Sequence, residues 1–220
     1  MSNVNSYPVS NTNKVKRVPK RAVYDKEVIH NILDSAFVCH VSFIIDDQPF
    51  IIPTAYGRSG ELVYIHGAAT SRMLSHLRGE IPVCVAVTQL DGIVLARSTF
   101  HSSMNYRSAI IFGKAHLIDS AEEKIQALKR ITDNIIKNRW QETRQPNEKE
   151  LKATSVLAIK IETASAKIRT GGPLDDPEDM DLDIWAGVIP LTIHAGLPIR
   201  DELLKKEVPL ASSVVNYSYA

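Results

Sequence analysis

Apolar residues alternate with a period of two from Phe37 onward, and this alternation constrains the fold more than any other feature of the sequence. The alternating apolar positions are Phe37, Cys39, Val41, Phe43 and Ile45. Turn-forming residues at 46–49 and 57–60 separate this run from two further apolar runs, at 50–56 and 62–66. Strands joined by such short turns pair antiparallel and bury one face. This part of the chain therefore predicts three antiparallel strands.

Helical periodicity predicts helices on both sides of this region. Asp25 can cap a first helix, and Ser120 a long one whose apolar positions recur every three or four residues. A short helix is predicted over about 71–77. Helices of this kind, each apolar on one face only, are expected to flank a sheet.

Further strands are predicted along the rest of the chain. Val83–Thr88 and Ile93–Phe100 are expected to form a hairpin that turns at Asp91–Gly92. Residues 109–118 and 156–161 add two more strands, and 141–150 is expected to be a charged loop. Pro53 cannot donate a backbone hydrogen bond, so it predicts an edge or a bulge in the second strand.

About seven strands and two or three helices predict a mainly β fold, an antiparallel β-barrel with flanking helices. Residues 1–20 are polar and are expected to form a disordered tail. Residues 21–168 would form the barrel domain. Residues 169–220, which contain Gly-Gly-Pro, an acidic run and several prolines, are expected to form an arm that packs on the barrel or on a dimer partner.

Composition and missing motifs exclude several classes of protein. The net charge of +1 gives no strong general attraction to nucleic acid or to an anionic membrane. No apolar stretch approaches the roughly 18 residues of a membrane span. Cys39 and Cys84 lie in predicted strands and are interpreted as reduced thiols, so we expect a cytoplasmic protein. No histidine pair has metal-ligand spacing, so no metal site is predicted. No P-loop or GxGxxG motif is present either.

The stretch from Tyr64 to Arg72 is a candidate phosphate site. A strand ends at His66, the small residues Gly67, Ala68 and Ala69 follow, and a helix starts near Ser71. Helix starts offer unpaired N–H groups, and an arginine offers a fork of donors suited to phosphate. A turn of this composition also occurs without any ligand, and that interpretation stays open here.

Two further stretches carry weaker signals. Tyr106, Arg107 and Ser108 enter a strand and would place an aromatic ring and several donors at the barrel rim. A solvated strand end is the alternative. The stretch Pro53–Thr54–Ala55 would leave backbone groups free to meet the edge of a planar heterocycle.

In order along the chain, these motifs resemble a known family. The matching motifs are Ile51–Gly57, Tyr64–Ala68, Pro82–Val85, Asp91–Ser98, Asn105–Ala109 and Phe112–Ala115. The chain is similar to the pyridoxamine 5′-phosphate oxidase-related flavin-binding family, in the branch that includes the nitroimidazole-resistance proteins. The similarity covers roughly residues 17–191.

This resemblance implies an FMN-binding split barrel of antiparallel Greek-key type. It further implies a homodimer with one FMN in each of two grooves between the subunits. The stretch Pro53–Ala55 would lie along the flavin ring, and Thr70, Ser71 and Arg72 would hold the phosphate. The remaining residues implied in the pocket are His66, Gly67, Ala68, Tyr106, Arg107, Ser108 and Trp185, the last brought in by the C-terminal arm.

The expected function is that of an FMN-dependent oxidoreductase acting on a small electron-poor molecule, such as a nitro-aromatic compound. His66 would be the catalytic residue that gives a proton to the reduced substrate. The oxidases that form pyridoxal phosphate bind the substrate phosphate with a signature of arginine and histidine. This signature is missing after Trp185, so oxidation of pyridoxamine phosphate is not expected. Two alternatives stay open: a flavin-binding protein without catalysis, and a haem-binding split barrel.

Overall fold

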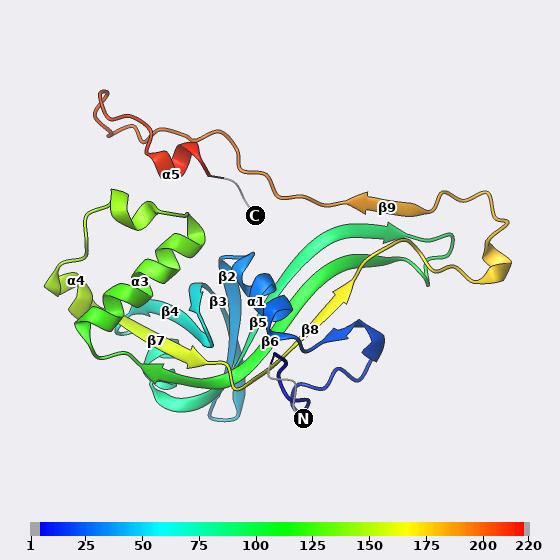
Figure 1. The fold of residues 1–220 in the computed structure, drawn as a ribbon, viewed down its shortest axis with the longest axis horizontal. Helices are drawn as coiled ribbons and strands as arrows, with labels where there is room; N and C mark the ends of the chain where they lie inside the picture. Colours follow the sequence, from blue (N-terminus) through cyan, green and yellow to red (C-terminus); the bar gives the residue numbers. More distant parts are fainter. Residues whose placement is uncertain (1–4, 218–220) are drawn as a thin grey trace. The chain divides into compact units, whose positions relative to one another are not determined.

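The computed structural model describes residues 5–217 and groups them into two compact units (Figure 1). Unit 1 contains the chain up to Leu33 and residues 85–112 and 162–192, and unit 2 contains residues 34–84, 113–161 and the chain from 193 onward. Strands β5 (Gly79–Leu95) and β6 (Ser103–Leu117) contribute residues to both units. This grouping differs from the linear division predicted from the sequence.

Unit 2 is built on an antiparallel sheet whose strands follow the predicted alternation. Its strands are β2 (Val38–Ile45), β3 (Gln48–Ser59), β4 (Leu62–Ala68), β7 (Thr154–Lys160) and the last residues of β6. They lie in the order β2–β3–β4–β7–β6, and each of these ladders is antiparallel. The predicted strands at 37–45, 50–56, 62–66 and 156–161 are therefore confirmed.

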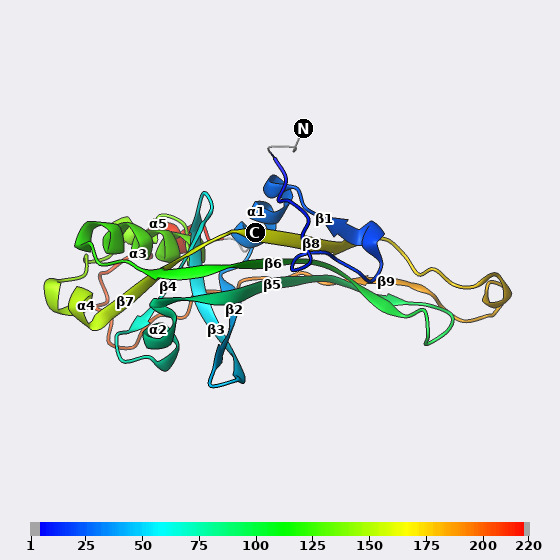
Figure 2. The same ribbon diagram turned by 90° about the horizontal axis from the view of Figure 1, so that it is seen from below.

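Unit 2 also contains helices. They are α2 (Arg72–Leu77), α3 (Ala121–Ile135), η2 (Arg139–Glu142), α4 (Glu148–Ala153) and α5 (Ser212–Val215). Helix α3 packs on β3, β4 and β7, and Figures 1 and 2 both show it beside β7. Ser120 caps α3 as predicted, accepting a hydrogen bond from the backbone N–H of Glu123 at 3.4 Å. Among residues 5–217, no helix is long and apolar enough to cross a membrane.

Helix α3 approaches β3 closely because of two residues. A Cβ at Gly57 would lie 2.6 Å from backbone atoms of Arg130 and Ile131, so only glycine allows this contact. One helical turn later, the side-chain amide of Asn134 donates to the carbonyl oxygens of Ala36 and Tyr56, both at 2.9 Å. These contacts fix the part of β3 that follows the predicted site residues Pro53–Ala55.

Unit 1 contains η1 (Pro19–Arg21), β1 (Ala22–Val23), α1 (Lys26–Asp34), β8 (Thr163–Arg169), η3 (Pro177–Asp179) and β9 (Gly187–Pro190), with parts of β5 and β6. Strand β8 pairs with β1 on one side and with β6 on the other, and β9 pairs with β5, all antiparallel. Figure 2 shows β1 beside β8. Asp25 caps α1 as predicted, accepting from Val28 N–H at 3.0 Å.

The predicted hairpin at Asp91–Gly92 is wrong. Strand β5 runs straight through both residues, and the turn lies after Leu95, before β6 begins. Gly92 instead allows β9 to approach β5 closely. A Cβ at this position would lie 3.0 Å from Val188 Cγ1 and 3.1 Å from the Ile189 carbonyl oxygen on β9. Asp91 is held within the strand region by an ion pair with Arg107.

The predicted disordered tail also differs from the structure, apart from residues 1–4, which lie outside the described residues. Tyr7 is 4% exposed, and Ser6 forms a β-bridge with Asp25. Asn13 is buried, and its amide donates to the Ala164 carbonyl oxygen on β8 at 2.8 Å. A polar segment is ordered here because its few apolar and amide groups find partners on a strand far away in the sequence.

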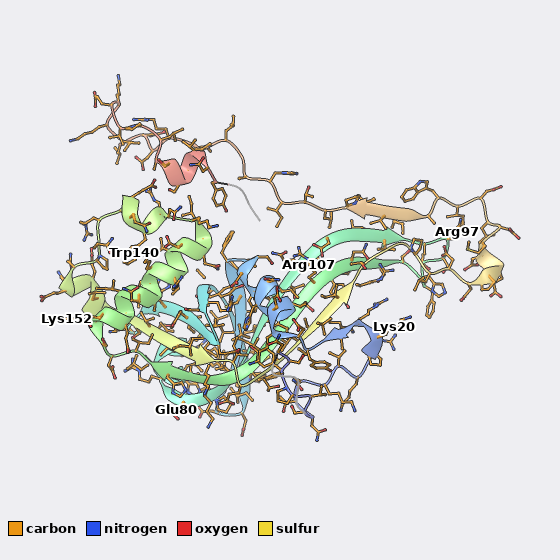
Figure 3. All side chains as sticks on the ribbon, in the orientation of Figure 1. Lys20, Glu80, Arg97, Arg107, Trp140 and Lys152 are labelled. Atoms are coloured by element: carbon orange, nitrogen blue, oxygen red, sulfur yellow. The ribbon has the colours of Figure 1, made fainter. Side chains whose placement is uncertain are left out.

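The sequence analysis missed several elements, among them β8 and α4. Strand β8 follows β7 directly, and α4 lies in the region predicted as a charged loop. The acidic run after residue 174 is not a fully solvated loop. Instead, Asp175 has a side chain only 1% exposed and forms an ion pair with Arg97 at 2.9 Å (Figure 3).

Candidate functional site

The stretch Pro53–Ala55 lies at a sheet edge, as its proline predicted. Strand β3 pairs with β2 over residues 48–55 and changes partner to β4 over residues 56–59. Pro53 is exposed and lies opposite His40 of β2. Among the described residues, the side of β3 away from β2 therefore has no strand partner at Pro53–Ala55, which is the arrangement a flat ligand needs to contact the backbone.

The small-residue corner after His66 is partly filled by the protein itself. Gly67 and Ala68 still belong to β4 and pair with Ser155 and Thr154 of β7. A Cβ at Gly67 would lie 3.0 Å from Leu74 Cδ1. Gly67 thus allows α2 to pack on β4, whereas the neighbouring Ala68 is exposed.

The start of α2 has its own internal contacts. The Ser71 hydroxyl caps the helix by accepting from Leu74 N–H at 3.5 Å, and Thr70 is exposed. The guanidinium of Arg72 lies over the ring of Phe50, 4.4 Å from its centroid. This cation–π contact holds Arg72 against the β2–β3 hairpin, and a guanidinium carries a fork of N–H donors suited to an anion.

His66 has the most unusual environment of the predicted residues. Its Nδ1 atom is buried and makes no hydrogen bond, and among residues 5–217 it is the one histidine ring nitrogen in that condition. Burial lowers the pKa of His66 below the usual 6.5, so the ring is neutral at pH 7. A buried imidazole nitrogen without a partner is costly, and a neutral imidazole is the form that ligates iron or accepts a hydrogen bond.

The predicted residues of β6 lie in unit 1, beside β8. Tyr106, Arg107 and Ser108 are in register with Arg169, Ile168 and Lys167. Arg107 donates from Nε and Nη2 to the carboxylate of Asp91 at 3.0 and 2.8 Å, and from Nη2 to Gln89 Oε1 at 2.6 Å (Figure 3). The hydrogen bond with Asp91 raises the pKa of Arg107. Arg107 therefore has a structural role, because its hydrogen bonds link β6 to β5.

Trp185 lies just before β9, also in unit 1, with 66% of its surface exposed. Its ring packs against Gly187, where a Cβ would lie 2.9 Å from Trp185 Cη2. The residues from Pro53 to Arg72 thus share unit 2, and Tyr106–Ser108 and Trp185 share unit 1. Sequence reasoning missed Arg169, a buried polar residue of unit 1, and gave no role to Asn105, which is buried and accepts a hydrogen bond from it. The register of β8 with β6 places Arg169 opposite Tyr106, and no local motif reveals it.

A family model described as pyridoxamine 5′-phosphate oxidase matches residues 25–168. The chain belongs to this family. The predicted family and fold class, a mainly antiparallel β fold with flanking helices of the split-barrel type, are confirmed for this pyridoxamine 5′-phosphate oxidase-like protein. A comparison with curated proteins finds no match.

Two solved structures resemble the oxidase-like chain over nearly its whole length. One is the flavocytochrome Anf3 from Azotobacter vinelandii, with 36% identity, a TM-score of 0.90, and 96% of this chain and 98% of that chain covered. The other is the FAD and haem binding protein from Mycobacterium smegmatis, with 36% identity, a TM-score of 0.86, and 90% and 97% covered.

A more distant neighbour is a proposed 5-nitroimidazole antibiotic resistance protein from Bacteroides thetaiotaomicron. It shares 22% identity over 67% of this chain and 86% of that chain, with a TM-score of 0.56. At this level of identity the likeness establishes the fold alone. The two full-length neighbours therefore guide the choice of cofactor more than the nitroimidazole branch does.

Proposed function

We propose that this protein binds a flavin and a haem and works as an oxidoreductase that moves electrons between them and a small molecule. The observation that carries the proposal is the likeness to two proteins named for both cofactors, at 36% identity over at least 90% of this chain. That coverage includes the C-terminal region beyond the family model, which ends at residue 168. A flavin supplies two-electron chemistry and a haem one-electron chemistry when bound.

The proposal also has to name the flavin, which is either FMN or FAD. The sequence resemblance implies FMN, whereas one of the two full-length neighbours is named for FAD. We favour FAD because that neighbour shares 36% identity with this chain. FAD carries a second phosphate and an adenosine, so it would need polar contacts beyond those of Thr70, Ser71 and Arg72. The mass of the flavin extracted from the purified protein decides between the two.

The residues of unit 2 fit a flat, anionic cofactor. The edge at Pro53–Ala55 offers backbone groups to a flavin ring, and Arg72 offers donors to a phosphate. His66 provides a buried nitrogen that lacks a partner, which fits a hydrogen bond to a flavin or a bond to haem iron. In the proposal, these residues would hold and orient the cofactors.

His66 suits a ligand role better than the proton-donor role expected from the sequence. Because burial lowers its pKa, little of the imidazole is protonated at neutral pH. Its Nδ1 has no hydrogen-bond partner to hold a proton in place. We therefore propose that His66 would hold the haem iron when haem is bound, and that a group outside this set would supply the proton for a reduced substrate.

The proposal also includes the dimer, the cellular location and the substrate expected from the sequence. A homodimer and a cytoplasmic location are supported by the family resemblance and by two free cysteines. Trp185, two-thirds exposed before β9, is a side chain that a partner subunit could cover. The substrate is expected to be small and electron-poor, and nitro-aromatic compounds are the first to test.

An absorbance spectrum of the purified full-length protein tests the proposal. We expect a flavin band and a Soret band together. His66→Ala should lose the Soret band and keep the flavin, whereas His40→Ala, on the exposed face of β2, should keep both. A protein with neither band after incubation with FAD, FMN and haem would overturn the proposal. Reduction of an acceptor by NADPH no faster than with free flavin would remove the catalytic part.

A further inference from the structure

A buried arginine without a counter-charge lies at the end of β8. Arg169 is 5% exposed. Its Nη1 donates to Asn105 Oδ1 and to the Gly171 carbonyl oxygen, and its Nη2 donates to the Gly172 carbonyl oxygen at 3.0 Å. Its Nε is buried without any partner. Neutral oxygens thus meet the two terminal nitrogens of the guanidinium, whereas its Nε–H donor has no acceptor.

The positive charge of Arg21 acts on the guanidinium of Arg169. Arg21 ends η1, directly before the β1 residues that pair with β8. Burial first, and then the charge of Arg21, lower the pKa of Arg169. Within residues 5–217, neither arginine takes part in an ion pair. A buried charge of this kind is costly unless an opposite charge compensates it.

The chain around Arg21 adds to the same positive field. No acidic residue occurs before Asp25, and residues 14–21 contain five basic side chains, namely Lys14, Lys16, Arg17, Lys20 and Arg21. Figure 3 shows Lys20 on this segment. The protein as a whole has a net charge of only +1, so this local excess is a specific feature of unit 1.

We propose that Arg21 and Arg169 form a binding site for the anionic group of the cofactor, either a phosphate of the flavin nucleotide or a propionate of the haem. This inference rests on the proposed function. Tyr106, which the sequence analysis placed in the cofactor pocket, lies opposite Arg169 in the β6–β8 ladder and provides an aromatic ring beside the cations. Because Arg169 is almost fully buried and has an Nε–H donor without an acceptor, the site suits a small oxyanion group such as a phosphate or a carboxylate.

Cofactor titrations of the full-length protein, freed of its cofactors, test the inference. FAD, FMN and haem are added separately to the wild type and to Arg21→Gln, Arg169→Met and Lys20→Gln. A lost charge-assisted hydrogen bond should weaken binding of the affected cofactor about tenfold to a hundredfold. Lys20→Gln is the matched control, since it removes the same charge from an exposed neighbour and should change affinity less than about threefold.

The pattern of losses identifies the anion. Weaker FAD binding with unchanged haem binding places a flavin phosphate at the site, and the reverse places a haem propionate there. Arg21→Gln keeps the test valid if Arg169→Met does not fold, because Arg21 is only half-buried. Unchanged affinity for all three cofactors in Arg21→Gln would overturn the inference. A wild type that binds none of them would instead overturn the proposed function.

Discussion

Replacing Gly57 by alanine tests whether the close contact between β3 and α3 holds unit 2 together. A Cβ at residue 57 would lie 2.6 Å from the carbonyl carbon and oxygen of Arg130 and from the nitrogen of Ile131. Carbon atoms attract one another at about 3.5–4.0 Å, so this contact is strongly repulsive. All three atoms belong to the helix backbone, and no change of rotamer can relieve the contact.

The cost follows from this geometry. Overpacking in a core costs about 1–3 kcal/mol, and we expect the upper end because the whole helix must shift. In a chain of this size, each kcal/mol lowers the melting temperature by about 2–4 °C, so Gly57→Ala should lower it by about 6–12 °C. Thermal unfolding followed by circular dichroism measures the change.

Gly196 provides the matched control for this experiment. A Cβ at Gly196 meets nothing within 4 Å, so Gly196→Ala should leave the melting temperature within about 2 °C of the wild type. A Gly57→Ala variant that melts in that same narrow range would refute the argument. It would mean that α3 can move away from β3 without loss, and that the position of Pro53–Ala55 does not depend on it.

Three further substitutions test other contacts. Asn134→Ala removes hydrogen bonds to the carbonyls of Ala36 and Tyr56, and should lower the free energy of unfolding in urea by about 2 kcal/mol; an unchanged midpoint would contradict this. Ser120→Ala removes the cap of α3 and should cost about 1 kcal/mol in the same assay, with no loss if the cap is unimportant. Because burial lowers the pKa of His66 below 6.5, the unfolded chain takes up the proton more readily, and stability should fall as the pH drops below 6.5. His66→Gln should reduce that fall between pH 7 and 5, and an identical slope would show that His66 is not responsible.

The sequence predicted those elements whose signals are local. Asp25 and Ser120 were identified as caps because a cap bonds to a backbone group three residues away. The alternation after Phe37 predicted β2 because its buried face is a property of that strand alone. Helix α4 was missed although Asn147 and Glu150 form a complete capping box, a local signal that was present in the sequence.

Other elements depend on partners distant in the sequence. Asp91–Gly92 resembles a hairpin turn, yet Arg107 pairs with the aspartate and β9 lies against the glycine. Strand β8 has a small and polar sequence that becomes strand through its pairing with β1 and β6. The candidate site shows the same limit, because the order of motifs identified the family but the unpartnered nitrogens of His66 and Arg169 depend on tertiary packing.

The two units have a consequence for how the protein can be divided. Each unit is assembled from three separate stretches of chain, and two strands belong to both. No single cut in the gene can therefore release either half as an intact piece. A polypeptide stopped before residue 162 would lack β8 and β9, and with them the strand neighbours of β1, part of β6 and part of β5. Insertions and fusions should be tolerated only at the ends of this chain or in its exposed loops.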